Sequence, residues 1–226
     1  MLRPRIAPCL LVRNGGLVKT VNFGNSKYVG DPINAVKIFN EKEVDELVFV
    51  DITATREKRR PDFERIREIA GECFMPLCYG GGVRSMDDAK QVIGCGVEKV
   101  AINSYAVENP EFVREAASEL ASSTIVVSID VKRDFLGKYH VHTHGGKKST
   151  DWHPVEFAIL MERMGAGEIL LTSIDRDGTQ KGYDLELIKS VADAVSIPVI
   201  ACGGPVRSAS KSWWTATGCS ADRSAT

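Results

Sequence analysis

The sequence predicts a (β/α)₈ barrel built from two similar halves, and three observations carry this prediction. Short runs rich in Val, Ile and Leu alternate with amphipathic helical segments along the 226 residues. Such continuous apolar runs are typical of parallel strands that are buried on both faces. The chain also repeats itself at an offset of about 120 residues. We expect a single domain over residues 1–226, with a first half at about 1–120 and an incomplete second half at 121–226.

The expected strands follow the apolar runs in chain order. The first lies within residues 6–16, and the others lie at 46–53, 75–82, 98–104, 123–131, 167–175 and 197–204. Two helix starts are marked by their first residues. Asp31 before Pro32 is a typical N-cap followed by a proline at the first helical position, and Ser85 is a second N-cap.

The repeat shows a defect at the carboxyl end of the chain. "MPLCYGGGVRS" at Met75 resembles "IPVIACGGPVRS" at Ile197, and "ELVFVDITAT" at Glu46 resembles "EILLTSIDRDGT" at Glu168. After the second glycine loop the chain continues only with "ASKSWWTATGCSADRSAT", which has no amphipathic period. We therefore expect a defective or truncated eighth module and exposed edges on the first and seventh strands.

Composition excludes several classes of protein. The net charge of -1 gives no footprint for nucleic acid or a membrane surface. No apolar run approaches the roughly 20 residues of a membrane span, and the amino terminus lacks a cleavage site, so we expect a cytoplasmic protein. The six cysteines form no CxxC pair, which predicts buried free thiols.

In a barrel of this class, functional residues lie where the strands end. The candidates at these ends are Leu11, Asp51, Gly80–Gly82, Asn103, Asp130, Thr172, Asp175, Asp177, Gly178, Thr179, Gly203 and Gly204. Two glycine loops are each followed by Arg-Ser and a helix start, which suits phosphate binding through backbone N–H groups. Two such sites in opposite halves predict a substrate with a phosphate at each end.

The motifs "GDPINAVKIFNEKEVDELVFVDITAT", "GGGVRS", "IDVKR", "THGGKKST" and "GAGEILLTSIDRDGTQKGYDLELI" closely resemble the cyclase subunit of imidazole glycerol phosphate synthase. The resemblance covers residues 1–204. It implies a TIM barrel that pairs with a glutaminase subunit and needs no cofactor or metal. It also implies that ammonia crosses the barrel to react with a bisphosphorylated ribulosyl-formimino aminoimidazole carboxamide nucleotide. The products are imidazole glycerol phosphate and aminoimidazole carboxamide ribotide, in histidine biosynthesis.

Residue by residue, the resemblance places the general acid/base pair of the family at Asp130 and at Leu11, where an acid is expected and absent. It implies an ammonia gate at Arg5, Glu46, Lys99 and Glu168. Substrate or phosphate contacts fall at Lys19, Asp51, Gly82, Asn103, Thr172, Asp177, Gly178, Gly203 and Gly204.

Because leucine cannot move a proton, a mechanism with two carboxylates is incomplete in this chain. Some relatives of the family that lack this acid deliver ammonia to a separate sugar-amidinating enzyme in surface-polysaccharide synthesis. That function is therefore the alternative to the cyclase. A sugar-phosphate isomerase of the same barrel type is a third possibility, which Leu11 and the gate residues argue against.

Two further segments have plain interpretations. "HVHTH" places His140, His142 and His144 on one strand face, where they form a metal site or, as we expect, part of a solvent-exposed hairpin. The charge run at residues 56–68 is expected to be a solvated helix face and the loop before it.

Overall fold

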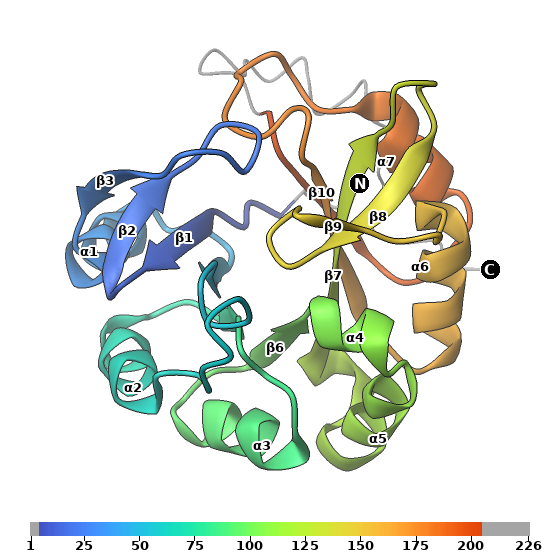
Figure 1. The fold of residues 1–226 in the computed structure, drawn as a ribbon. Helices are drawn as coiled ribbons and strands as arrows, with labels where there is room; N and C mark the ends of the chain where they lie inside the picture. Colours follow the sequence, from blue (N-terminus) through green and yellow to red (C-terminus); the bar gives the residue numbers. More distant parts are fainter. Residues whose placement is uncertain (1–4, 205–226) are drawn as a thin grey trace.

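The computed structural model describes residues 5–204, and in this range helices surround a curled, mainly parallel sheet (Figure 1). The parallel strands follow one another across the sheet in chain order. They are β1 (Cys9–Arg13), β4 (Leu47–Asp51), β5 (Leu77–Gly80), β6 (Lys99–Ile102), β7 (Ile125–Arg133), β10 (Glu168–Ser173) and β11 (Val199–Cys202). The predicted α/β barrel class is confirmed. The prediction of a defective eighth module concerns residues after 204 and lies outside the described residues.

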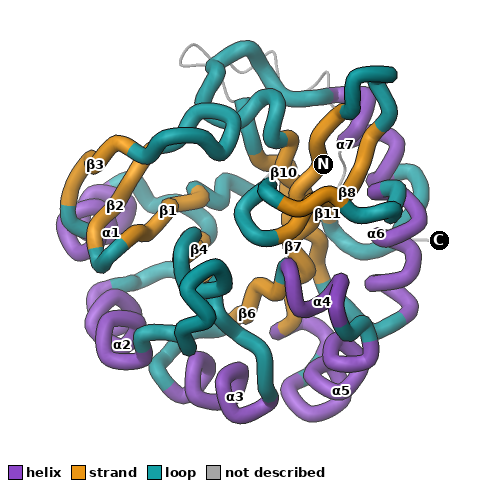
Figure 2. Tube along the Cα trace, in the orientation of Figure 1, coloured by secondary structure: helices purple, strands orange, loops and turns teal. Residues whose placement is uncertain are grey.

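The helices cover the outer face of the sheet (Figure 2). They are α1 (Pro32–Glu41), α2 (Phe63–Glu72), α3 (Met86–Gly94), α4 (Ser104–Glu108), α5 (Glu111–Leu120), α6 (Pro154–Arg163) and α7 (Leu185–Ala192), with a short 3₁₀ turn η1 (Ser122–Thr124). Both predicted N-caps are confirmed. The Asp31 carboxylate accepts a hydrogen bond from Ile33 N at 2.8 Å, and Ser85 Oγ accepts one from Asp88 N at 3.1 Å.

Two antiparallel hairpins extend the sheet beyond the barrel strands. The first contains β2 (Gly16–Lys19) and β3 (Lys27–Gly30) and pairs with β1. The second contains β8 (Tyr139–Thr143) and β9 (Lys148–Ser149) and pairs with β7. Each hairpin therefore extends a barrel strand at its carboxyl end.

The expected exposed edges are present only in part. Within the described residues β11 pairs with β10 alone, so its other edge is unpaired. The expectation for β1 is wrong over most of its length, because β2 pairs with it from Leu11 to Arg13. The reason is local: Asn14 and Gly15 both have positive φ, so the two-residue turn returns β2 directly onto β1.

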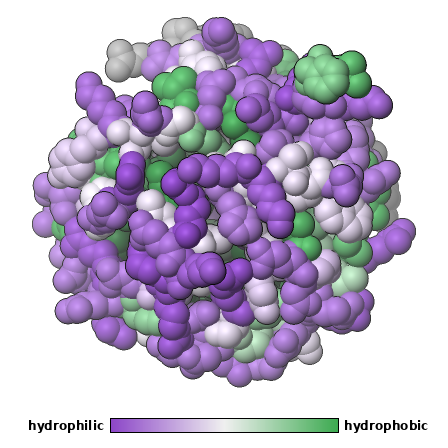
Figure 3. All heavy atoms as spheres, viewed as in Figure 1, coloured by the Kyte–Doolittle hydropathy of each residue, from purple (hydrophilic) through white to green (hydrophobic). Residues whose placement is uncertain are grey.

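The core has two parts. The larger one lies between the sheet and the helices and includes Phe49, Phe157 and Met161. A smaller cluster, here called the inner layer, lies inside the curl of the sheet and consists of Val48, Cys78, Ala101, Val126 and Leu170. On the face shown in Figure 3, hydrophilic residues predominate and apolar ones gather in small patches. No helix within residues 5–204 combines the length and the apolar character that crossing a membrane requires.

Candidate active site

A cavity opens at the carboxyl ends of the parallel strands. It brings together nine of the residues that the sequence singles out: Leu11, Asp51, Gly80, Gly81, Gly82, Asn103, Asp130, Thr172 and Asp177. Six others do not line it: Lys19, Asp175, Gly178, Thr179, Gly203 and Gly204. The strand ends thus converge on one site, as expected for this barrel class.

Asp130 is the buried acid of this cavity, with 9% of its surface exposed. Asn103 Nδ2 donates a hydrogen bond to Asp130 Oδ2 at 3.1 Å, and Thr172 contributes a second one. Burial raises the pKa of Asp130 to about 7, with a smaller contribution from the charge of Asp177, while the two hydrogen bonds oppose the rise. A carboxyl group with this pKa can both accept and release a proton at neutral pH.

Leu11 lines the same cavity as Asp130, so the two strands that the sequence pairs do bring these residues to one site. Leu11 is opposite Val50 of β4 and Val18 of β2, and its side chain is half-buried. Its neighbours across both ladders are apolar. The position therefore offers no group that can exchange a proton with a substrate.

Both carboxylate oxygens of Asp51 accept hydrogen bonds from the loop that follows β4. Its Oδ1 atom accepts hydrogen bonds from Thr53 N at 2.9 Å, Thr53 Oγ1 at 2.9 Å and Ala54 N at 3.1 Å. Its Oδ2 atom accepts one from Arg59 Nη2 at 3.1 Å. These contacts hold the turn after β4, so Asp51 shapes the rim of the cavity through this turn.

Asp177, in the loop after β10, links the two ends of the sheet through hydrogen bonds with Thr20 and Asn22. Thr20 Oγ1, which follows β2, donates to Asp177 Oδ2 at 2.7 Å, and Asn22 N donates to Asp177 O at 2.9 Å. Burial raises the pKa of Asp177, against the hydrogen bond from Thr20. Sequence reasoning missed Thr20, because 157 residues separate it from its partner.

The glycine loops are shaped by close backbone approach. A Cβ atom on Gly82 would lie 2.7 Å from Arg59 O, and one on Gly203 would lie 2.7 Å from Ser173 O. Both have positive φ, at 79° and 90°. Glycine is thus required by the turns themselves, and a phosphate-binding role for these loops is a separate proposal.

Three arginines that were not among the expected site residues also line the cavity: Arg13, Arg56 and Arg84. Arg13 donates to Ser26 Oγ at 2.6 Å, and Arg84 pairs with Glu108 at 2.8 Å. Arg56 makes no hydrogen bond or ion pair with any other described residue and is exposed. The sequence signal that could have identified Arg56 as a cavity residue is its position directly after "DITAT", which ends an expected strand. A rim of cations favours an anionic ligand.

At the opposite, amino-terminal end of the strands, the four predicted gate residues form one ion-pair cluster. Lys99 Nζ lies 2.9 Å from Glu46 Oε2 and 2.8 Å from Glu168 Oε2, and Arg5 Nη2 lies 2.8 Å from Glu168 Oε1. Burial disfavours the charge of Lys99, but the two glutamates outweigh it and raise its pKa. Glu46 Oε1 is buried and has no hydrogen-bond partner among the described residues. The cluster therefore retains one unused acceptor.

Cys9 and Cys202 lie in the cavity beside Asp130. Their thiols share a hydrogen bond, which raises the pKa of Cys9 and lowers that of Cys202. The prediction of buried free thiols is confirmed for Cys78 and Cys95. Cys9, Cys73 and Cys202 are free but only partly buried, and Cys219 lies beyond the described range.

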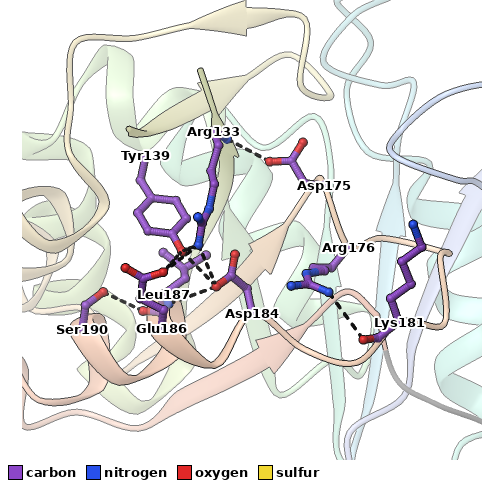
Figure 4. A network of polar contacts seen from close by, with 9 residues as sticks. All are labelled: Arg133, Tyr139, Asp175, Arg176, Lys181, Asp184, Glu186, Leu187 and Ser190. Atoms are coloured by element: carbon purple, nitrogen blue, oxygen red, sulfur yellow. Dashed lines mark hydrogen bonds and ion pairs between the residues drawn. The ribbon is translucent and has the colours of Figure 1, made fainter. Parts of the chain in front are cut away.

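The β7–β8 hairpin is fastened to the start of α7 by a polar network (Figure 4). Tyr139 Oη donates to Asp184 Oδ1 at 2.9 Å, and Arg133 Nη2 donates to Glu186 Oε2 at 2.8 Å. The Arg133 guanidinium also lies over the Tyr139 ring, 4.4 Å from its centroid, and its backbone N–H donates to Asp175 at 2.9 Å. The hairpin that extends the Asp130 strand is therefore held in place.

The hairpin expected around "HVHTH" is present as β8, but the three histidines do not share one face of the strand. His140 and His142 are two residues apart on β8, whereas His144 follows its end with a φ of 56°. Each ring has its own partner: Asp134 for His140, Gly146 O for His142, and Thr143 and Glu108 for His144. They are half-buried rather than fully exposed.

The charge run before and within α2 is only partly solvated. Arg59 pairs with Asp51, and Arg60 pairs with Asp87 and Asp88 at 2.6 Å each. These arginines tie the loop after β4 to α3, so the run also supports the cavity rim.

Comparisons with known proteins agree with this geometry. Residues 5–210 match the family described as histidine biosynthesis protein. A protein of Pseudomonas aeruginosa with the provisional name imidazole glycerol phosphate synthase subunit hisF2 is 50% identical over 204 residues. The subunit HisF of Alkaliphilus metalliredigens is 46% identical over 204 residues. Each match covers 90% of this chain and 81% of the relative.

Proposed function

Since the chain belongs to the histidine biosynthesis protein family, we propose that it is the cyclase subunit of imidazole glycerol phosphate synthase. In this function it uses ammonia to convert the bisphosphorylated ribulosyl-formimino aminoimidazole carboxamide nucleotide to imidazole glycerol phosphate and aminoimidazole carboxamide ribotide. The observation that carries the proposal is Asp130, a buried acid with a pKa of about 7 in the cavity at the strand ends. The names of the relatives support the same function.

The two ends of the barrel suit the two reactants. Ammonia enters at the cluster of Arg5, Glu46, Lys99 and Glu168, where Glu46 Oε1 offers an unused acceptor. It then passes the inner layer, which consists of small and medium apolar side chains, and reaches the cavity. A path lined by apolar side chains keeps ammonia neutral, because protonation would leave a charge without partners.

The substrate lies across the cavity with one phosphate on each half. Gly82 and Asn103 contact the first phosphate in the cavity, and the second phosphate lies just beyond the cavity lining, at the backbone N–H groups of Gly178 and Gly203. Lys19, which is exposed on the β2 strand, closes over the substrate. The arginines of the rim attract the anionic nucleotide.

Asp130 is the residue that transfers protons to and from the substrate. Asn103 and Thr172 hold its carboxyl group in place, and its near-neutral pKa makes both protonation states available. Leu11 lies where the second acid of the family is expected. We therefore propose that the chain cyclises its substrate slowly.

The partner is a glutaminase subunit, bound as a heterodimer at the amino-terminal face, where the ion-pair cluster lies. The complex acts in the cytoplasm. HisF is named as a subunit in the relatives, and this supports a two-subunit enzyme.

A second function is favoured by one observation, the apolar Leu11 beside Asp130. In it the chain conducts ammonia to a separate sugar-amidinating enzyme and makes no imidazole. The names of the relatives favour the cyclase.

The purified chain with ammonium chloride and the bisphosphorylated nucleotide tests the proposal. We expect slow formation of imidazole glycerol phosphate, and Asp130→Asn should lower its rate by about 10²–10⁴-fold. Formation of no product by the chain, alone or with its glutaminase, would exclude the cyclase and leave ammonia delivery.

A further inference from the structure

A second cavity lies on the other side of the sheet from the active site. Side chains alternate along a strand, so Leu11, Val50 and Gly80 line the active-site cavity while Val12, Phe49 and Tyr79 point outward to α2. The outer cavity has a volume of about 280 Å³. This lies near the lower end of the range for small-molecule sites, so it suits a compact ligand.

The cavity contains a polar group that forms no hydrogen bond with the rest of the described chain. Only 5% of the Tyr79 surface is exposed, yet its hydroxyl makes no hydrogen bond with any other described residue. Among the described residues, Glu46 Oε1 is the one fully buried side-chain atom without a partner, so the Tyr79 hydroxyl oxygen keeps some accessible surface and its hydrogen-bonding capacity is free. The Tyr79 hydroxyl belongs to the lining of the cavity, where a ligand can reach it.

Around this hydroxyl the cavity has an apolar base and a polar rim. The base is formed by Val12, Phe49, Ile66 and Ile69. The rim carries Arg59 and Arg65. Arg59 Nη1 and Arg65 Nε donate no hydrogen bond within the described residues, so both guanidinium groups keep a spare donor.

The two acidic residues of the lining, Asp51 and Asp62, do not accept hydrogen bonds from these spare donors. The Asp51 carboxylate already accepts four hydrogen bonds, one from Arg59 and three from the turn after β4. Asp62 is the N-cap of α2 and accepts from Arg65 N at 3.1 Å. Spare donors therefore outnumber spare acceptors, and the missing group is an acceptor.

We propose that this outer cavity is a second binding site, for a small carboxylate with a compact apolar body. The carboxylate accepts from the Tyr79 hydroxyl and from the arginine rim, and the apolar body packs against Phe49 and Ile66. The turn at Asn14 and Gly15 forms one wall, and Arg65 Nη2 already donates to Gly15 O at 3.4 Å. A bound ligand therefore contacts the hairpin that carries Lys19.

Calorimetric titration of the full chain with phenylacetate tests the site. A ligand of this size is expected to bind one to one with a dissociation constant on the order of 1 mM. Phenylacetamide, which keeps the shape and lacks the charge, should bind at least about tenfold more weakly. Equal binding of the two would overturn the choice of a carboxylate, and absence of heat with phenylacetate at about 10 mM would overturn the site.

Tyr79→Phe removes only the hydroxyl and should weaken phenylacetate binding about tenfold. Tyr28→Phe, at an exposed tyrosine on β3, is the matched control and should leave binding unchanged. The melting temperature of Tyr79→Phe should not fall, because the hydroxyl has no partner to lose. Unchanged binding by Tyr79→Phe, or a clear loss of its stability without ligand, would contradict the proposal.

Discussion

The β1 and β7 regions are built alike, yet they differ in chemistry and in support. Each parallel strand continues into an antiparallel hairpin, and Leu11 and Asp130 are the first residues of their respective hairpin ladders. On the side of its hairpin, β7 is also supported by β6, whose Ala101 is opposite Val126. The matching side of β1 before Leu11 has no strand among the described residues. The same backbone position thus holds an acid in a closed part of the sheet and a leucine beside its open edge.

The Leu11 and Asp130 positions are alike in backbone geometry but differ in the side chains around them. The pKa of Asp130 is near neutral because its carboxyl group is buried, while hydrogen bonds from Asn103, directly after β6, and from Thr172 of β10 oppose the rise. An acid at Leu11 would lie next to Val18 and Val50, with no comparable donors across the ladders. The position is equivalent, but its surroundings no longer support a second acid to the same degree.

The largest effect is expected from Asp130→Asn. If Asp130 transfers the proton, this change should lower the rate of imidazole glycerol phosphate formation by about 10²–10⁴-fold, since the amide cannot exchange a proton. A steady-state assay with ammonium chloride measures it. A rate within about threefold of the parent chain would remove Asp130 from the catalytic role.

Restoring the first acid should have the opposite effect. Leu11→Asp is expected to raise the rate at least about tenfold. Leu11→Asn is the control, because it is polar and cannot exchange a proton. Equal rates for the parent chain and for Leu11→Asp would show that the two positions are not a catalytic pair.

The stability of the fold should depend on the ionisation of Asp130. Its pKa is raised from 3.8 to about 7, so its contribution to stability is full below about pH 4 and is lost as the pH rises to about 7. Asp130→Asn lacks this ionisation. We expect the variant to be more stable than the parent at pH 8, by on the order of 1–4 kcal/mol. Urea unfolding at pH 4 and pH 8 checks this, and a difference that does not change with pH would contradict it.

A smaller effect is expected at the link between the two ends of the sheet. Thr20→Val removes the hydrogen bond to Asp177 and should lower the free energy of unfolding by about 0.5–1.5 kcal/mol. Thr20→Ser keeps the hydroxyl and is the control. If both variants lose the same stability, the methyl group of Thr20 matters rather than its hydrogen bond.

The sequence by itself determined the barrel class, the order of the strands and both predicted helix starts. These features depend on local signals: apolar runs, Asp31 before Pro32, and Ser85 at a helix start. Its position at a strand end also singled out Asp130, whereas the four charged residues at the amino-terminal face were implied by the family resemblance and by no local pattern. The convergence of these ends follows from parallel packing alone.

Only the tertiary structure decided how these residues are used. Side-chain directions in the folded chain decide three sets of contacts: those of Asp51 with its own turn, of Thr20 with Asp177, and of Cys9 with Cys202. Two of these contacts join residues more than 150 positions apart, and no local pattern records such pairs. The pKa of Asp130 likewise depends on burial by several strands at once. Local sequence therefore places a group at a strand end, and the packing around it sets its chemistry.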